Sequence, residues 1–136
     1  MVFGLIFSRS VTMHRLAIIV AVSLIAASPA LAAETRCGWY MNPTPGNLWL
    51  MDKDATWTIT SQAEATGPDA EGVENTPDFD DKQFVETNNP GSGYGYGCAC
   101  MSVTVDKAEE RITRVFSGEI KPLSVCKADK SLPSPD

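Results

Sequence analysis

Cys98-Ala-Cys-Met-Ser-Val-Thr-Val-Asp106 is the stretch of sequence that decides the fold. Its side chains alternate in character, with Met101, Val103 and Val105 at one parity and both cysteines at the other. Successive side chains of a β-strand point to opposite faces of the sheet. Unless a bulge intervenes, this strand buries its apolar residues on one face and carries Cys98 and Cys100 on the second face.

The same period of two recurs along the chain. Trp57 and Ile59, for example, alternate with three threonines. The strands expected from this pattern are residues 37–41, 48–51, 56–60, 83–87, 101–106 and 111–116, with turns at 52–55 and 107–110. No helical period is found after residue 32. The pattern predicts an all-β domain, a small twisted antiparallel sheet or barrel-like meander.

Four cysteines, Cys37, Cys98, Cys100 and Cys126, predict two disulfides that staple this domain. A Cys98–Cys100 bond is excluded, because residues i and i+2 of a strand lie about 6.6 Å apart, whereas bonded cysteines need Cβ atoms about 3.8 Å apart. One of the two therefore bonds Cys37 and the other Cys126, and spacing does not decide which. A redox-active Cys98-Ala99-Cys100 pair or a zinc site would need neighbouring cations or histidines that the sequence lacks.

The first 32 residues have the organisation of a secretory signal peptide. Arg9, His14 and Arg15 precede the apolar run 16–27, and Ala30-Leu31-Ala32 forms a small-x-small cleavage site. The run is too short to span a bilayer, so no membrane anchor is expected after cleavage. Met13 offers an alternative start, which would make residues 1–12 an extension. We expect residues 33–136 to be a single periplasmic or secreted domain.

The charge of the chain favours basic partners. Two of the 11 basic residues precede the cleavage site while all 17 acidic residues follow it, so the net charge changes from −6 to about −8. Such a surface argues against nucleic acid and anionic lipid as partners. The alternative is that the acidity serves only to keep the protein in solution.

Candidate binding residues lie where glycine and tyrosine alternate, in Gly93-Tyr-Gly-Tyr-Gly97. An extended backbone would place the rings of Tyr94 and Tyr96 on one side, where they could stack on a sugar or contact a protein. Trp39 is a third candidate for this aromatic surface. The alternative interpretation is structural, with glycines that permit close packing and tyrosines that cover a small core.

The acidic residues raise the question of metal binding and catalysis. The oxygen-bearing candidates for calcium are Asp52, Asp54, Asp69, Asp78, Asp80 and Asp81, several of them in the expected loop 62–81. They lack the glycine and distal glutamate of an EF-hand loop, so no metal or other cofactor is expected. Because the mature chain has no histidine, a Ser-His-Asp or Cys-His arrangement is impossible. A glycosidase-type carboxylate pair stays open, but we do not expect an enzyme.

Several motifs together resemble domain-of-unknown-function family 4087. The motifs are Arg36-Cys-Gly-Trp39, Asn42-Pro-Thr-Pro45, Asn47-Leu-Trp-Leu50, Trp57-Thr-Ile59, Gly93-Tyr-Gly-Tyr-Gly-Cys-Ala-Cys100, Ser117-Gly118, Pro122-Leu123, Cys126 and Leu132-Pro133. The resemblance implies a small exported bacterial protein with one disulfide-linked domain. It implies no activity, ligand or catalytic residue.

Three functions follow as hypotheses. The first is a non-enzymatic binding module for an envelope protein or a glycan. The second is an inhibitor of a cationic enzyme such as lysozyme, by analogy with other small acidic exported domains. The third is a carboxylate-based hydrolase. The oligomeric state is left open.

Overall fold

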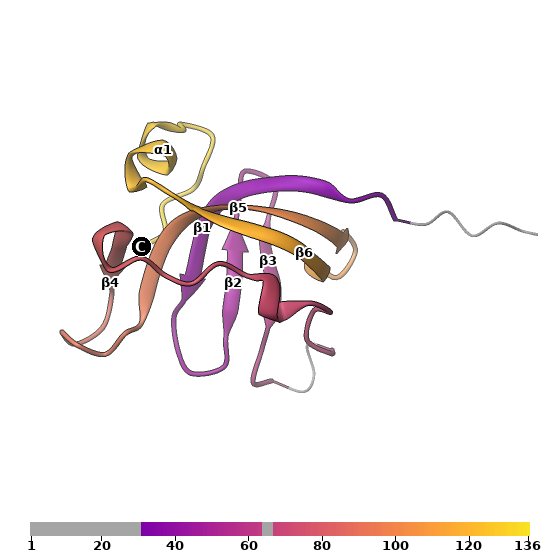
Figure 1. The fold of residues 1–136 in the computed structure, drawn as a ribbon, viewed down its shortest axis with the longest axis horizontal. Helices are drawn as coiled ribbons and strands as arrows, with labels where there is room; N and C mark the ends of the chain where they lie inside the picture. The colour runs from indigo at the N-terminus through magenta and orange to yellow at the C-terminus, as the bar shows by residue number, and fades with distance from the viewer. Residues whose placement is uncertain (1–30, 64–66) are drawn as a thin grey trace, which may run out of the picture.

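The computed structural model describes residues 31–63 and 67–136. The expected signal peptide falls almost entirely on residues 1–30, outside the described residues. The strands are β1 (Glu34–Asn42), β2 (Leu48–Met51), β3 (Thr56–Thr60), β4 (Phe84–Glu86), β5 (Gly95–Asp106) and β6 (Arg111–Lys121), as Figure 1 shows. Each expected strand is present, and β1, β5 and β6 are longer than predicted. Among the described residues no helix is long and apolar enough to cross a membrane.

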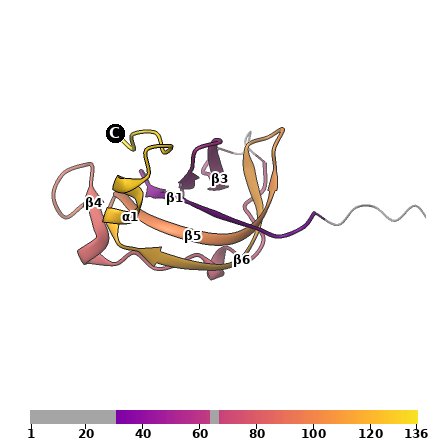
Figure 2. The same cartoon turned by 90° about the horizontal axis from the view of Figure 1, so that it is seen from above.

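The strands form one sheet whose order is β1-β2-β3-β6-β5-β4, and β1 also pairs with β5. Strands β1, β2, β3, β6 and β5 therefore close into a ring, which confirms the barrel-like architecture (Figures 1 and 2). One neighbour pair differs from the expected antiparallel arrangement. Strands β3 and β6 run parallel and meet in the single register pair Thr58 and Arg111. This order is that of a five-stranded Greek-key barrel of the OB type.

Two irregularities in β6 bend the barrel. Ser102 pairs with Ser117 and Val103 with Val115, so Phe116 is an extra residue on β6. Thr113, nearer the start of β6, is skipped in the same way. Extra residues of this kind bend a strand and increase its twist. The two bulges therefore let β6 follow β5 around the barrel and reach β3.

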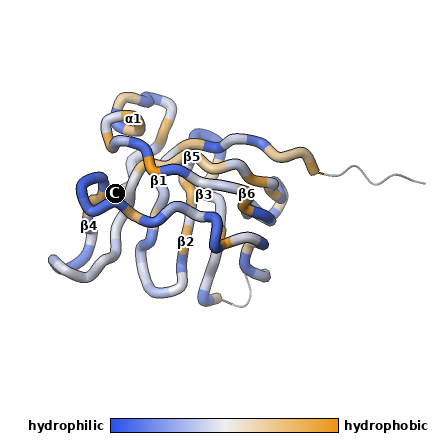
Figure 3. Tube along the Cα trace, viewed as in Figure 1, coloured by the Kyte–Doolittle hydropathy of each residue, from blue (hydrophilic) through white to orange (hydrophobic). Residues whose placement is uncertain are grey.

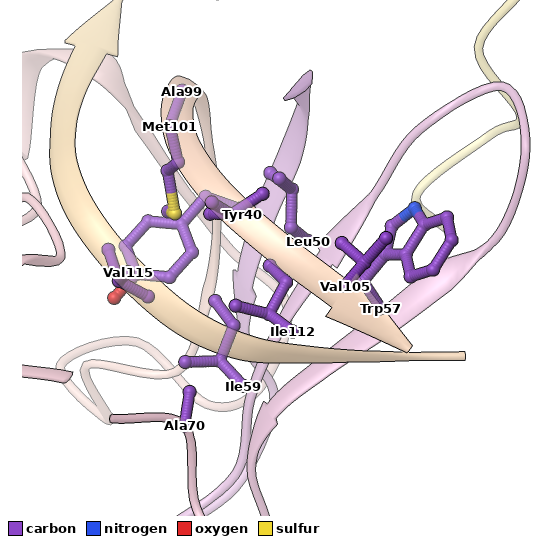
Figure 4. Close-up of a cluster of buried hydrophobic side chains, with 11 residues drawn as sticks. Tyr40, Leu50, Trp57, Ile59, Ala70, Ala99, Met101, Val105, Ile112 and Val115 are labelled. Carbon is purple, nitrogen blue, oxygen red and sulfur yellow. The ribbon is translucent and has the colours of Figure 1, made fainter. Parts of the chain in front are cut away.

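The barrel interior holds the larger of two apolar clusters, drawn in Figure 4. Met101, Val103 and Val105 of β5 all point into it, as the alternation predicted. The other members come from every barrel strand and from the segment after β3: Tyr40, Leu50, Trp57, Ile59, Ala70, Ala99, Ile112 and Val115. Each large aliphatic side chain fully buried here contributes about 1.5–3 kcal/mol to stability.

The segment between β3 and β4 is largely hydrophilic in Figure 3, yet part of it packs against the barrel. Ala70 donates its amide to the Ile59 carbonyl at 2.9 Å and is buried. The Phe79 ring stacks on Tyr40 with centroids 4.4 Å apart. Short 3-10 turns, η2 (Val73–Asn75) and η3 (Asp81–Gln83), lie between and after these contacts. The expected loop 62–81 thus supplies Ala70, Val73 and Phe79 to the packing of the interior.

The sequence pattern did not predict the helix α1 (Leu123–Ala128). Six residues make fewer than two turns, too few for a 3.6-residue period to be visible. Pro122 precedes the helix and has a fixed φ that suits a helix start. Cys126 is the buried residue of the helix, and it holds α1 against the barrel.

Candidate functional site

A second apolar cluster lies on the outer face of β1, β2 and β5, and we call it the aromatic face. Its buried members are Trp39, Met41, Tyr96, Cys98 and Cys126, with Trp49, Met51, Val85, Leu123 and Leu132 packed against them. The register explains the grouping, because Trp39 lies opposite Cys98 and Met41 opposite Tyr96 across the β1–β5 ladder. Helix α1 and residues 129–136, which we call the tail, contribute the leucines that pack on this face.

The structure brings two of the three predicted binding residues together, but it buries them. Trp39 and Tyr96 are 4% and 6% exposed, and their rings meet edge to face at 5.3 Å. The Trp39 indole Nε1 donates to the Pro133 carbonyl oxygen of the tail at 3.1 Å. Tyr94 is half-buried and outside this cluster. Trp39 and Tyr96 therefore form no open aromatic surface, because the tail lies over them.

The alternating glycines of β5 have a structural reason. Gly95 lies on the face opposite to Tyr96, where a Cβ atom would lie 1.9 Å from the Val85 carbonyl oxygen. Gly97 has more room, since the nearest atom to its Cβ would be the Gln83 carbonyl oxygen at 3.1 Å. Glycine at residue 95 thus permits the pairing of β4 with β5.

Both disulfides form on the second face of β5, as the parity of the cysteines predicted. Cys37 lies opposite Cys100 in the β1–β5 register and is bonded to it, and Cys98 is bonded to Cys126. The excluded Cys98–Cys100 bond is absent, and no free cysteine is found in the described residues. The Cys98–Cys126 bridge is buried, whereas Cys37 is exposed. Both bridges are consistent with folding outside the reducing cytosol.

A charged pocket of about 350 Å³ lies beside the aromatic face, between β1, the β2–β3 turn and the tail. We call it the hairpin pocket, and it is lined by Glu34, Thr35, Arg36, Cys37, Asp52, Lys53, Asp54, Asp129, Ser131 and Leu132. Four of these side chains are carboxylates and two are cations. Asp52 and Asp54 were expected in a turn, but Arg36 and Asp129 were not among the candidates. Asp129 lies next to the turn only because the tail docks there, and no local sequence pattern predicts this contact.

Arg36 is the centre of an ion-pair network in this pocket. Its Nη1 donates to Asp52 at 2.6 Å and its Nε to Glu34 at 2.7 Å. Asp52 also accepts the amides of Asp54 and Ala55 through Oδ1, which fixes the β2–β3 turn. Arg36 and Asp52 are both buried, so each compensates the charge of the other.

The protonation state of the pocket follows from these contacts. Burial alone would raise the pKa of Asp52, but the Trp57 indole, Arg36 and two backbone amides outweigh burial and lower it. The Trp57 Nε1–H faces Asp52 without the geometry of a full hydrogen bond. Lys53 and then Arg36 lower the pKa of Asp54, and the Ser131 hydroxyl and amide lower the pKa of Asp129. These three carboxyl groups are therefore ionised at neutral pH.

Two of the aspartates described after β3 make local hydrogen bonds to backbone amides. Asp80 accepts the Lys82 amide and caps η3, and Asp69 accepts the Ser61 amide. Within residues 31–63 and 67–136, no group of three or more His, Cys, Asp or Glu side chains is arranged to hold a metal ion.

The family model described as "protein of unknown function (DUF4087)" matches residues 31–133, a span that includes all four cysteines. No curated protein and no solved structure matches the chain. The match covers most of the chain and all six strands. The chain therefore belongs to the DUF4087 family.

Proposed function

We propose that this protein is a non-enzymatic binding module of the periplasm or the extracellular medium, and that it binds a basic envelope protein at the hairpin pocket. The observation that carries the proposal is the way in which the charged side chains of that pocket are paired. Asp52 and Glu34 neutralise the buried Arg36. Asp54 pairs with Lys53 at 2.8 Å and with Arg36 at 3.2 Å, and Asp129 carries an ionised carboxylate at an exposed position. Four carboxylates face two cations in the lining, so the pocket has a net negative charge.

Such a pocket suits a lysine or arginine side chain of a partner. Hydrogen bonds between a guanidinium or ammonium group and carboxylates are among the stronger hydrogen bonds in proteins. The net charge of about −8 after cleavage would also accelerate encounter with a basic protein. Arg36 and Asp52 hold β1 against the β2–β3 turn, so that side of the pocket needs little ordering when it binds.

The pocket is poorly suited to acid–base catalysis. A glycosidase needs one carboxylic acid with a raised pKa, held beside an ionised carboxylate. Here Asp52, Asp54 and Asp129 all have lowered pKa values. Glycan stacking is also less favoured than a basic partner, because Trp39 and Tyr96 are buried under the tail.

The narrower proposal, inhibition of a cationic enzyme, uses the same pocket. The test is therefore made with lysozyme as the basic probe, in a binding titration and an activity assay on the same samples. We expect binding that weakens as NaCl rises from 20 to 500 mM, because exposed ion pairs are screened by salt. Asp54→Asn/Asp129→Asn should weaken this binding at least about tenfold, a loss of roughly 1.4 kcal/mol.

The matched control is Asp78→Asn/Asp81→Asn, which removes the same charge at exposed residues away from the pocket. Equal weakening by both double variants would show that net charge alone drives binding, and would contradict the pocket. Binding without inhibition would support the module and exclude the inhibitor. Turnover of a chromogenic glycoside by the wild-type protein would contradict a non-enzymatic function.

A further inference from the structure

The tail covers the aromatic face in the way that a bound peptide would. Leu132 packs on the cluster that contains Trp39 and Tyr96. The Trp39 indole donates to the backbone carbonyl of Pro133. The Asp136 carboxylate lies close enough to Tyr96 to raise its pKa, in addition to the larger effect of burial.

The sequence of the tail is typical of an extended peptide ligand. It reads Leu132-Pro-Ser-Pro-Asp136, and residues 133–136 have no regular secondary structure. Each proline fixes its own φ and keeps the residue before it out of the α region, so the segment favours a polyproline II conformation. Domains that recognise such peptides use aromatic grooves and contact the ligand backbone.

The tail is also weakly attached to the barrel beyond Cys126. Ser131, Leu132 and Asp136 donate their amides to Asp129 and Ser134 of the tail itself. Residues 129–136 are exposed except Leu132 and Pro135, which are half-buried. In contrast, Trp39, Tyr96 and Cys98 beneath the tail belong to the strands and are held by the β1–β5 ladder. The tail could therefore leave while the aromatic face stays in place.

From these contacts we infer that the aromatic face is a binding site for an extended, proline-containing peptide of a partner protein. The chain's own tail occupies that site in cis, and the partner peptide displaces it. The site takes an apolar residue where Leu132 lies and a backbone carbonyl at the Trp39 indole. The two proposals share the tail, because Asp129, Ser131 and Leu132 also line the hairpin pocket. A peptide that displaces the tail would therefore also remove Asp129 from that pocket, but the two ligands differ in class and are tested with different probes.

The test uses full-length mature chains and a fluorescein-labelled peptide with the sequence of residues 130–136. A short tether gives the tail an effective concentration of about the millimolar order, so the wild-type chain should bind the probe weakly. Two variants loosen the tail. Pro133→Gly/Pro135→Gly leaves every residue of the aromatic face unchanged, and Leu132→Ser removes only the leucine that the tail places on that face. We expect each to bind the probe at least about tenfold more tightly than wild type in fluorescence anisotropy.

Three controls make the result specific. Val125→Ser changes an exposed residue of α1 and should bind like wild type. A probe with alanine in place of both prolines should bind the loosened chains more weakly. Trp39→Phe, made in the Pro133→Gly/Pro135→Gly chain, removes the indole donor and should abolish binding while the melting curve stays cooperative.

A second measurement covers the wild-type chain itself. In a heteronuclear NMR titration with millimolar unlabelled probe, the Trp39 indole N–H signal should shift, whereas that of Trp57, buried in the other cluster, should not. The inference is overturned if neither loosened variant binds the probe more tightly than wild type. It is also overturned if the loosened chains exchange tails and dimerise in light scattering, since the occupant would then be a second copy.

Discussion

The guanidinium carbon of Arg36 lies over the ring of Trp57, 4.0 Å from its centre. The two residues come from β1 and β3, which are not neighbours in the sheet. A desolvated cation over an indole ring contributes about 2 kcal/mol or more. Together with the ion pair to Asp52, this contact links the rim of the barrel interior to the hairpin pocket.

The Arg36–Asp52 pair predicts a large asymmetry between two neighbouring aspartates. Asp52→Ala should destabilise the protein by about 3–5 kcal/mol, because it leaves a buried Arg36 without its main partner and frees two turn amides. Asp54→Ala should cost no more than about 1 kcal/mol, since that side chain is exposed. Urea unfolding of the two variants measures the difference. Equal costs would show that Asp52 does not compensate Arg36.

The lowered pKa of Asp52 predicts a loss of stability in acid. A carboxyl whose pKa is lower in the folded state than its ordinary 3.8 stabilises the fold at pH values above 3.8. That contribution is lost as the pH falls below 3.8 and through the folded-state pKa. Urea unfolding between pH 6 and pH 2.5 should therefore show a steeper decline for wild type than for Asp52→Asn. Parallel curves for the two proteins would rule out Asp52 as a source of the acid sensitivity.

The two disulfides should respond differently to a mild reductant. Cys37 is exposed, whereas Cys98 and Cys126 are 1% and 3% exposed, so a small thiol should reduce the Cys37–Cys100 bridge first. The β1–β5 ladder would persist, because it continues on both sides of Cys37 and Cys100. Alkylation followed by peptide mass mapping should find label on Cys37 and Cys100 while the near-UV circular dichroism is unchanged. Labelling of all four cysteines at the same rate would contradict this order.

Gly95 predicts a steric cost at the β4–β5 pairing. Gly95→Ala would place a methyl group 1.9 Å from the Val85 carbonyl oxygen, where backbone must move, and should cost about 1–3 kcal/mol. Gly97→Ala is the matched control, because its nearest contact would be 3.1 Å and should cost less. Thermal melts of both variants give the comparison. A smaller loss for Gly95→Ala than for Gly97→Ala would contradict the close approach at residue 95.

The burial of Tyr96 in the aromatic face predicts that Tyr96 and Tyr94 contribute differently to stability. Tyr96→Ala should cost about 3–5 kcal/mol, as loss of a buried aromatic side chain does. Tyr94→Ala should cost less, because Tyr94 is half-buried and outside the cluster. Melting curves decide between them, and equal, small losses would show that the tail does not seal Tyr96.

Sequence periodicity predicted the strands and the two faces of β5, because a strand's side chains alternate wherever one face is buried. It also excluded the Cys98–Cys100 bond, which depends on local geometry alone. The partners of Cys98 and Cys100 stayed open, since they depend on the register between β1 and β5, which lie far apart in the chain. The burial of Trp39 was unpredictable for a similar reason. It depends on the hydrogen bond from Trp39 to Pro133, and the sequence near either residue does not predict that bond.

Strand β5 has no exposed residue along Gly95–Asp106, and it pairs with β1, β4 and β6. One face of β5 fills the barrel and the other lies beneath α1 and the tail, so both clusters share its backbone. Melting of either cluster would disturb the strand on which the other is built, so we expect the barrel and the aromatic face to unfold together. The slowest amide hydrogen exchange is therefore expected in the centre of β5, where opening requires the whole domain to unfold.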